Sequence, residues 1–101
     1  MAQFNELLIP EPAKEDPKSF EILRVWMTKT GQYVILKPGV AKDPAGWGIV
    51  IADVMRHIAN AYEQVEGRDR SSTFERIRAG LDAELSSPTD RPRGSVVKSR
   101  E

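Results

Sequence analysis

Residues 20–36, FEILRVWMTKTGQYVIL, decide the fold that this sequence predicts. Both ends of the stretch are rich in β-branched and aromatic residues, which are typical of strands. Gly31 between them supplies the positive φ that a tight hairpin loop needs. We therefore expect a two-stranded antiparallel β-hairpin. A two-residue loop at Thr30-Gly31 would place Met27 opposite Val34, whereas a three-residue loop would shift this pairing, so the sequence leaves the register open.

Both faces of the expected hairpin are apolar, because successive side chains of a strand point to opposite sides of the sheet. One face would carry Leu23, Val25, Met27, Val34 and Leu36. Helices downstream can cover one face only, and aromatic side chains are enriched in the cores of protein interfaces. The other face is therefore a candidate dimer interface. Its residues are Ile22, Trp26, Tyr33 and Ile35.

Two helices are expected after the hairpin. Asp43-Pro44 is a typical helix start, because aspartate caps well and proline is tolerated in the first turn. Gly67 is a typical stop. A second helix is predicted to begin at Ser72, which forms a capping-box pattern with Glu75, and to end before Pro88. Apolar residues at helical spacing are expected to place one face of the first helix in the core. They are Trp47, Val50, Ile51, Val54, Ile58, Ala61, Tyr62 and Val65.

The predicted fold class is α+β, with the order ββαα in a single domain of residues 19–87. Residues 1–18 contain several prolines and charges, which predict an extended N-terminal tail, and residues 88–101 read as a flexible C-terminal tail. Domains below about 70–80 residues rarely supply a sufficient core without disulfides, metals or oligomerisation. Since the chain has no cysteine, we expect dimerisation to complete the fold. The alternative is a monomer in which the apolar cluster of residues 4–9 covers the second hairpin face or adds a strand.

Charge and hydropathy exclude several classes of protein. The 101 residues include 15 basic and 15 acidic side chains, which disfavours binding of nucleic acid through overall charge. No apolar run approaches the roughly 20 residues that span a bilayer, and the first residues lack the features of a secretory signal. We therefore expect a cytoplasmic protein without a membrane association. The charge is segregated, because residues 19–42 are basic and residues 43–66 are acidic.

One histidine is the starting point for any catalytic site. His57 follows Asp53 by one helical turn, and a carboxylate that orients an imidazole is a known catalytic arrangement. No serine or threonine lies at helical spacing to act as a nucleophile, and no second histidine suggests a metal site. We therefore assign no catalytic residue, no metal ligand and no cofactor.

The start of the first expected helix is a second polar candidate. Free N–H groups at a helix N-terminus attract anions, and Lys42 precedes the stretch Asp43–Gly48. Asp43 as the cap would compete for those groups, and close packing of the glycines against the hairpin, with Trp47 as a core anchor, is favoured instead. The residues of this candidate polar or ligand site are Lys42, Trp47, Asp53, Arg56 and His57.

Three stretches resemble one known family. FEILRVW at residues 20–26, DPAGWGI at residues 43–49, and AD followed by RHIANAY within residues 52–62 are similar to DUF5076, a family of small bacterial proteins of unknown function. The resemblance spans residues 20–62 and implies a free-standing bacterial protein. It implies no activity and transfers no functional residue.

The leading functional hypothesis is a homodimeric, non-enzymatic interaction or regulatory module, with a second copy and an unidentified protein as partners. The alternative is a protein that binds a small anionic ligand at the helix start Asp43–Gly48. An enzyme that uses His57 and Asp53 is the least favoured hypothesis.

Overall fold

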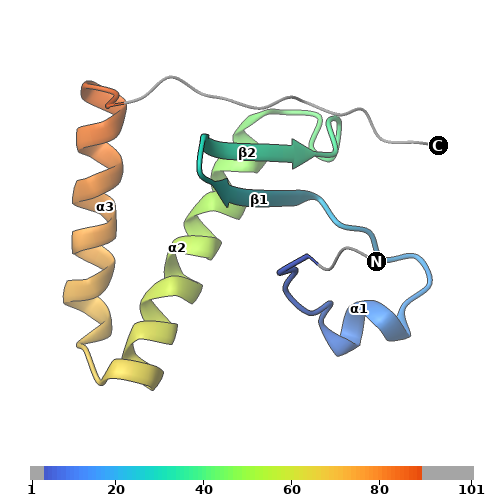
Figure 1. Cartoon of the computed structure of the whole chain (residues 1–101), viewed down its shortest axis with the longest axis horizontal. Coiled ribbons are helices and arrows are strands. Elements are labelled where there is room, and N and C mark those ends of the chain that lie inside the picture. The colour runs from blue at the N-terminus through green and yellow to red at the C-terminus, as the bar shows by residue number, and fades with distance from the viewer. Residues whose placement is uncertain (1–3, 90–101) are drawn as a thin grey trace. The chain divides into compact units, whose positions relative to one another are not determined.

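The computed structural model describes residues 4–89. Figure 1 shows the elements in chain order, and they confirm the α+β class and the ββαα order. The chain divides into two compact units, whose described parts are residues 4–37 and residues 38–89, and each is treated by itself. The expected C-terminal tail lies outside the described residues except for residues 88 and 89. The elements are α1 (Glu11–Glu15), β1 (Leu23–Thr28), β2 (Gly31–Leu36), α2 (Ala45–Glu66) and α3 (Arg70–Ser86).

The hairpin forms as predicted, and the structure sets the register that the sequence left open. Val25 lies opposite Val34, and Thr28 lies opposite Gly31, so the turn is Lys29-Thr30, and the possible loop at Thr30-Gly31, which would pair Met27 with Val34, is not the one formed. The Thr28 hydroxyl stabilises this turn, since its Oγ1 accepts from the Thr30 N–H at 3.2 Å and lies 3.0 Å from the Gly31 carbonyl oxygen. Because a shift of two residues keeps every side chain on its side of the sheet, both predicted faces persist.

The N-terminal segment contains a short helix, so the prediction of an extended tail is wrong for residues 11–15. Pro10 precedes α1, and its carbonyl accepts from the Ala13 N–H at 3.0 Å. Pro12 lies in the first turn, where a missing N–H costs nothing. The Ser19 hydroxyl lies 2.6 Å from the Ala13 carbonyl oxygen and holds the chain where it leaves the helix.

Helix α2 begins and ends at the predicted signals. The Asp43 side chain accepts from the Ala45 N–H at 3.0 Å, and Pro44 already has helical dihedral angles. At the other end, Gly67 has a φ of 69° and donates its N–H to the Glu63 carbonyl at 3.0 Å. Glycine adopts this left-handed conformation without the steric cost of a Cβ atom.

Helix α3 begins earlier than predicted, because Asp69 and not Ser72 is its N-cap. The Asp69 carboxylate accepts from the Ser72 N–H at 2.9 Å and from the Ser72 hydroxyl at 2.9 Å. Both hydrogen bonds lower the pKa of Asp69 below its ordinary value, and the one from the Ser72 backbone contributes most. The expected capping box between Ser72 and Glu75 is therefore wrong: a carboxylate three residues earlier takes the role of the serine.

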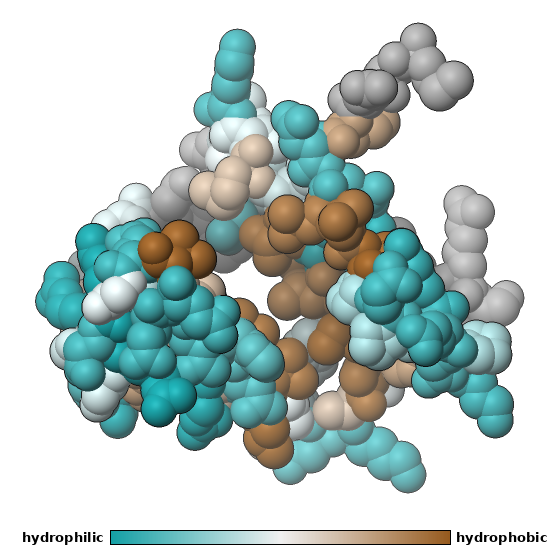
Figure 2. All heavy atoms as spheres, turned by 90° about the horizontal axis from the view of Figure 1, so that it is seen from below, coloured by the Kyte–Doolittle hydropathy of each residue, from teal (hydrophilic) through white to brown (hydrophobic). Residues whose placement is uncertain are grey.

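The contact between α2 and α3 encloses very little. Ala59 is 1% exposed and is the buried hydrophobic residue of the part of the chain that the structure describes. Helix α3 meets α2 on the side of Arg56, Ala59 and Asn60, and of the apolar stripe that the sequence predicts as core, Tyr62 lines a groove together with α3 residues. Ile51 of that stripe remains 48% exposed, and Figure 2 shows hydrophobic side chains, in brown, at the surface.

Candidate interaction surface

The second face of the hairpin is the surface that the sequence singled out, and we call it the Trp26 face: Ile22, Arg24, Trp26, Tyr33 and Ile35. The registered pairs Arg24–Ile35 and Trp26–Tyr33 confirm that these side chains share one side of the sheet. Tyr33 is 38% exposed and Ile35 is 47% exposed. A large apolar surface therefore remains open at the β2 side of this face.

The N-terminal segment reaches the Trp26 face at its β1 side. The Phe4 ring meets the Trp26 ring edge to face, with centroids 6.5 Å apart and planes at 87°. Glu6 Oε2 lies 3.7 Å from Arg24 Nη1. The alternative in which residues 4–9 cover this face is thus realised in part. These residues add no strand, and Leu8 remains 93% exposed.

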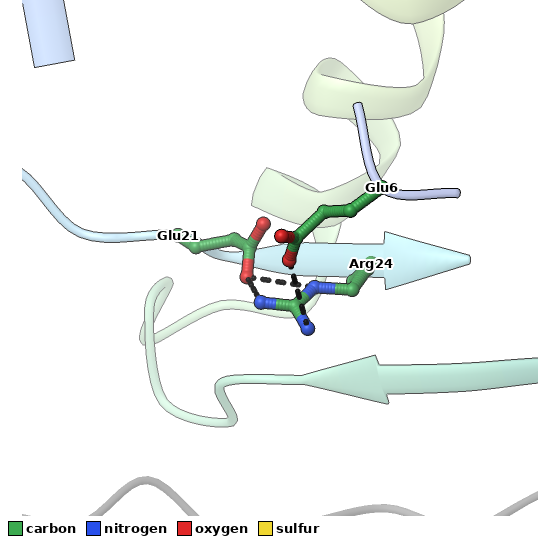
Figure 3. Close-up of polar contacts among 3 residues, drawn as sticks. All are labelled: Glu6, Glu21 and Arg24. Atoms are coloured by element: carbon green, nitrogen blue, oxygen red, sulfur yellow. Dashed lines mark hydrogen bonds and ion pairs between the residues drawn. The ribbon is translucent and has the colours of Figure 1, made fainter. Parts of the chain in front are cut away.

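Two carboxylates surround the one arginine of the Trp26 face. Figure 3 shows Glu21 and Glu6 directed at the Arg24 guanidinium; Glu21 Oε1 accepts from Arg24 Nη2 at 2.6 Å and from Nε at 3.1 Å. The Glu21 hydrogen bond, more than its charge, raises the pKa of Arg24 above its ordinary value. The guanidinium is thereby engaged within the chain, and this gives no support to a phosphate or nucleic-acid contact.

The candidate polar residues do not assemble into one site. Asp53 Oδ1 lies 3.3 Å from Arg56 Nη1, and the Arg56 guanidinium lies 6.0 Å from the centre of the Phe74 ring. Asp53 therefore pairs with Arg56 and not with His57. His57 and Lys42 are exposed, and within residues 4–89 neither side chain makes a hydrogen bond or an ion pair. Trp47 is half-buried in the first turn of α2.

The start of α2 has its N–H groups already bonded. The Ala45 N–H donates to the Asp43 side chain, the Gly46 N–H to the Asp43 carbonyl at 2.9 Å, and the Trp47 N–H to the Pro44 carbonyl at 2.9 Å. These three donors are unavailable to an anion in this conformation. Helix N-termini bind anions through free N–H groups, so the geometry does not favour the ligand-binding alternative.

The glycines at this helix start differ in their surroundings. A Cβ atom on Gly46 would lie 2.6 Å from the Ala41 Cβ atom, so Gly46 permits a close approach of the preceding loop. A Cβ atom on Gly48 would meet nothing within 4 Å. Gly46 therefore packs closely on this loop, whereas Gly48 has no close neighbour, and the expected packing of the glycines on the hairpin stays a prediction.

A shallow groove between α2 and α3 was missed by the sequence analysis. Arg70 Nη1 donates to Asn60 Oδ1 at 3.4 Å across it. Its lining includes Arg70 and Ser71, which lie before the predicted start of the second helix, so the misplaced cap concealed them. The lining residues are Arg56, Ala59, Asn60, Arg70, Ser71 and Phe74.

Across residues 4–89, no three His, Cys, Asp or Glu side chains gather closely enough to hold a metal ion. Over the same range, no helix combines the length and the apolar character needed to cross a membrane.

The fold and this surface define a small α+β domain in which an apolar hairpin precedes a helical pair. The chain belongs to the family described as Domain of unknown function (DUF5076), whose model matches residues 6–89. The match includes residues 6–18, which the sequence analysis placed outside the domain. No curated protein matches the chain.

One solved structure is similar over almost the whole chain. It is described as "Structure of a putative pyruvate dehydrogenase from the photosynthetic bacterium Rhodopseudomonas palustrus CGA009". The two sequences are 26% identical, the TM-score is 0.72, and the similarity covers 94% of this chain and 97% of that chain. The similarity extends over the complete fold and does not stop at the hairpin.

Proposed function

We propose that this protein is a homodimeric, non-enzymatic interaction module of the bacterial cytoplasm, with the Trp26 face in its subunit interface. The observation that carries the proposal is the exposure of large apolar side chains in both units. Tyr33 and Ile35 in the hairpin, and Ile51 and Ile58 in α2, are all at least one-third exposed. Exposed apolar surface on this scale is typical of an interaction site.

Among residues 4–89, neither unit contains a large, fully buried side chain. Burying one large aliphatic or aromatic side chain stabilises a fold by about 1.5–3 kcal/mol. A lone two-stranded sheet is marginally stable in water, and the helical pair buries Ala59 at its contact. A second copy supplies the same apolar surface again, and a two-fold axis lets one surface cover its equivalent.

The exposed N-terminal residues support a role in binding another protein. Phe4 and Glu6 attach this segment to β1, whereas Leu7 and Leu8 project away, 90% and 93% exposed. Two adjacent exposed leucines next to an anchored residue form an apolar surface of the kind that marks interaction sites.

The interface is tested by the double substitution Trp26→Ala, Tyr33→Ala in the full chain. Light scattering during size exclusion should show that the double variant elutes mainly as a monomer at a concentration where the unmodified chain is a dimer. Leu85→Ala is the matched control, because Leu85 is an exposed apolar residue of α3; it should leave the dimer intact. A double variant as dimeric as the control would exclude the Trp26 face from the interface.

An enzyme activity is a second candidate only because of the similar solved structure. That structure is described as a putative pyruvate dehydrogenase. Support from this chain is weak, since His57 is exposed and Asp53 is paired with Arg56. The test is pyruvate consumption by the purified protein with thiamine diphosphate and an electron acceptor. Turnover that His57→Ala abolishes would establish the enzyme and refute the non-enzymatic proposal.

A further inference from the structure

We infer that β2 pairs antiparallel with β2 of a second copy, which joins two hairpins into a four-stranded sheet of order β1-β2-β2-β1. This inference rests on the homodimer proposed above and specifies its geometry. The two-fold axis would pass through the sheet at Val34. Three features of the hairpin support it: the direction of the backbone groups, the composition of β2, and the choice of residues that can lie opposite each other.

The first feature is the direction of the backbone groups of β2. The Lys37 N–H donates to the Ile22 carbonyl at 3.0 Å, which identifies these two as a hydrogen-bonded pair. Such pairs alternate with non-hydrogen-bonded pairs along an antiparallel ladder. Val25 and Val34 form a non-hydrogen-bonded pair. Val34 and its neighbours two residues away, Gln32 and Leu36, therefore direct their N–H and C=O groups away from β1. The sheet has two strands in the described chain, so no third strand of residues 4–89 meets this edge.

The second feature is the composition of β2. Gly31–Leu36 contains no charged residue and no proline. Proteins usually protect exposed strand edges with charges, prolines or bulges. By contrast, β1 carries Arg24, and both Phe4 and Glu6 contact β1 side chains. The edge of β2 therefore has the composition of a paired strand, whereas β1 has that of an outer strand.

The third feature is the choice of residues that can lie opposite each other when two copies of β2 pair. An antiparallel pair exchanges hydrogen bonds only between residues whose backbone groups point toward each other. With the axis at Val34, Val34 faces Val34 of the partner subunit and Gln32 faces Leu36 of the partner subunit. All three outward-directed residues then form hydrogen-bonded pairs. If the axis is displaced by one residue toward either end, either Gln32 or Leu36 has no partner within β2 of the second copy.

This arrangement also covers the open part of the Trp26 face. Tyr33 would lie directly opposite Ile35 of the partner subunit, on the same side of the sheet. Cross-strand pairs of an aromatic and a β-branched residue stabilise sheets. The exposure of Tyr33 and Ile35 in the single chain is the expected signature of two side chains that cover each other across a symmetric strand pair.

The chain contains no cysteine, which permits a clean cross-linking test. Residues opposite each other in a hydrogen-bonded antiparallel pair have Cα atoms about 5.5 Å apart, and a disulfide spans about 4.4–6.8 Å between Cα atoms. Val34→Cys should therefore form a covalent dimer under mild oxidation, and reduction should reverse it. Val25→Cys is the matched control, because Val25 lies opposite Val34 in β1; it should remain at least tenfold less cross-linked.

Hydrogen exchange on the unmodified chain supplies the second measurement and requires no variant to fold. The amides of Gln32, Val34 and Leu36 should be protected, and dilution should remove this protection at the concentration where the dimer dissociates. The Val25 amide should exchange rapidly throughout. Protection of the three amides that is independent of concentration, or preferential cross-linking of Val25→Cys, would overturn the inference.

The homodimer and the pairing of β2 with β2 are refuted by different results. A chain that sedimentation shows to be a monomer refutes the homodimer and the strand pairing together. A dimer whose Gln32, Val34 and Leu36 amides exchange rapidly refutes only the pairing through β2, and leaves the Trp26 face as the interface.

Discussion

Ala59 offers the most direct test of the contact between α2 and α3. Its side chain is 1% exposed, so a larger side chain at this position cannot be accommodated unless its neighbours move. Inserting extra methylene groups into a closed contact typically costs about 1–3 kcal/mol. For a domain of this size, each kcal/mol lowers Tm by roughly 4–8 °C. Ala59→Leu should therefore lower Tm by at least about 4 °C.

The assay is thermal unfolding followed by circular dichroism, at one fixed protomer concentration because dimer stability depends on concentration. Ala79→Leu is the matched control, since Ala79 is exposed on α3 and leucine is nearly as good a helix former as alanine. Its Tm should stay within about 2 °C of the unmodified chain. Equal Tm values for Ala59→Leu and Ala79→Leu would refute the conclusion that the helices close over Ala59.

Two further predictions concern the helix starts. Gly46→Ala should destabilise the protein by about 1–3 kcal/mol, because the new Cβ atom would lie 2.6 Å from that of Ala41. Gly48→Ala should stabilise it by about 0.5–1 kcal/mol, because its Cβ atom meets nothing within 4 Å; chemical denaturation that ranks the two variants in the opposite order would contradict this geometry. Asp69→Ala should lower Tm at pH 7. The pKa of Asp69 is lowered in the folded chain. The cap therefore stabilises the folded state fully at pH values above the aspartate pKa of the unfolded chain, about 3.9. This stabilisation is lost as the pH falls through the pKa of the folded chain. Thermal scans should therefore show the Tm difference shrinking below pH 4, and a difference that grows there would contradict the assignment.

The signals that predicted correctly are local ones. Gly31 marked the hairpin, Asp43-Pro44 the start of α2, and Gly67 its end, because each of these residues satisfies a backbone requirement at its own position. Sequence spacing failed where neighbouring residues compete for the same local role, because it favoured Ser72 over Asp69 as the cap of α3. The Thr28 hydroxyl favours a turn at Lys29-Thr30, and sequence spacing does not rank that turn against Thr30-Gly31.

The candidate site was less predictable, because its contacts join distant parts of the chain. Trp26 and Arg24 were identifiable as interface-type residues, whereas their contacts with Phe4 and Glu6 depend on how the N-terminal segment folds back. The apolar stripe of α2 was recognised, but periodicity states only that a face is apolar and not what covers it. Ile51 shows this limit, since it belongs to the stripe and remains 48% exposed.

Sedimentation equilibrium of the full, unmodified chain tests the central claim most directly. The claim is that a second copy covers the apolar surface that one chain leaves open. At tens of micromolar, the account predicts a species of twice the 11.3 kDa chain mass, which dissociates on dilution. A stably folded species of 11.3 kDa at that concentration would contradict the account.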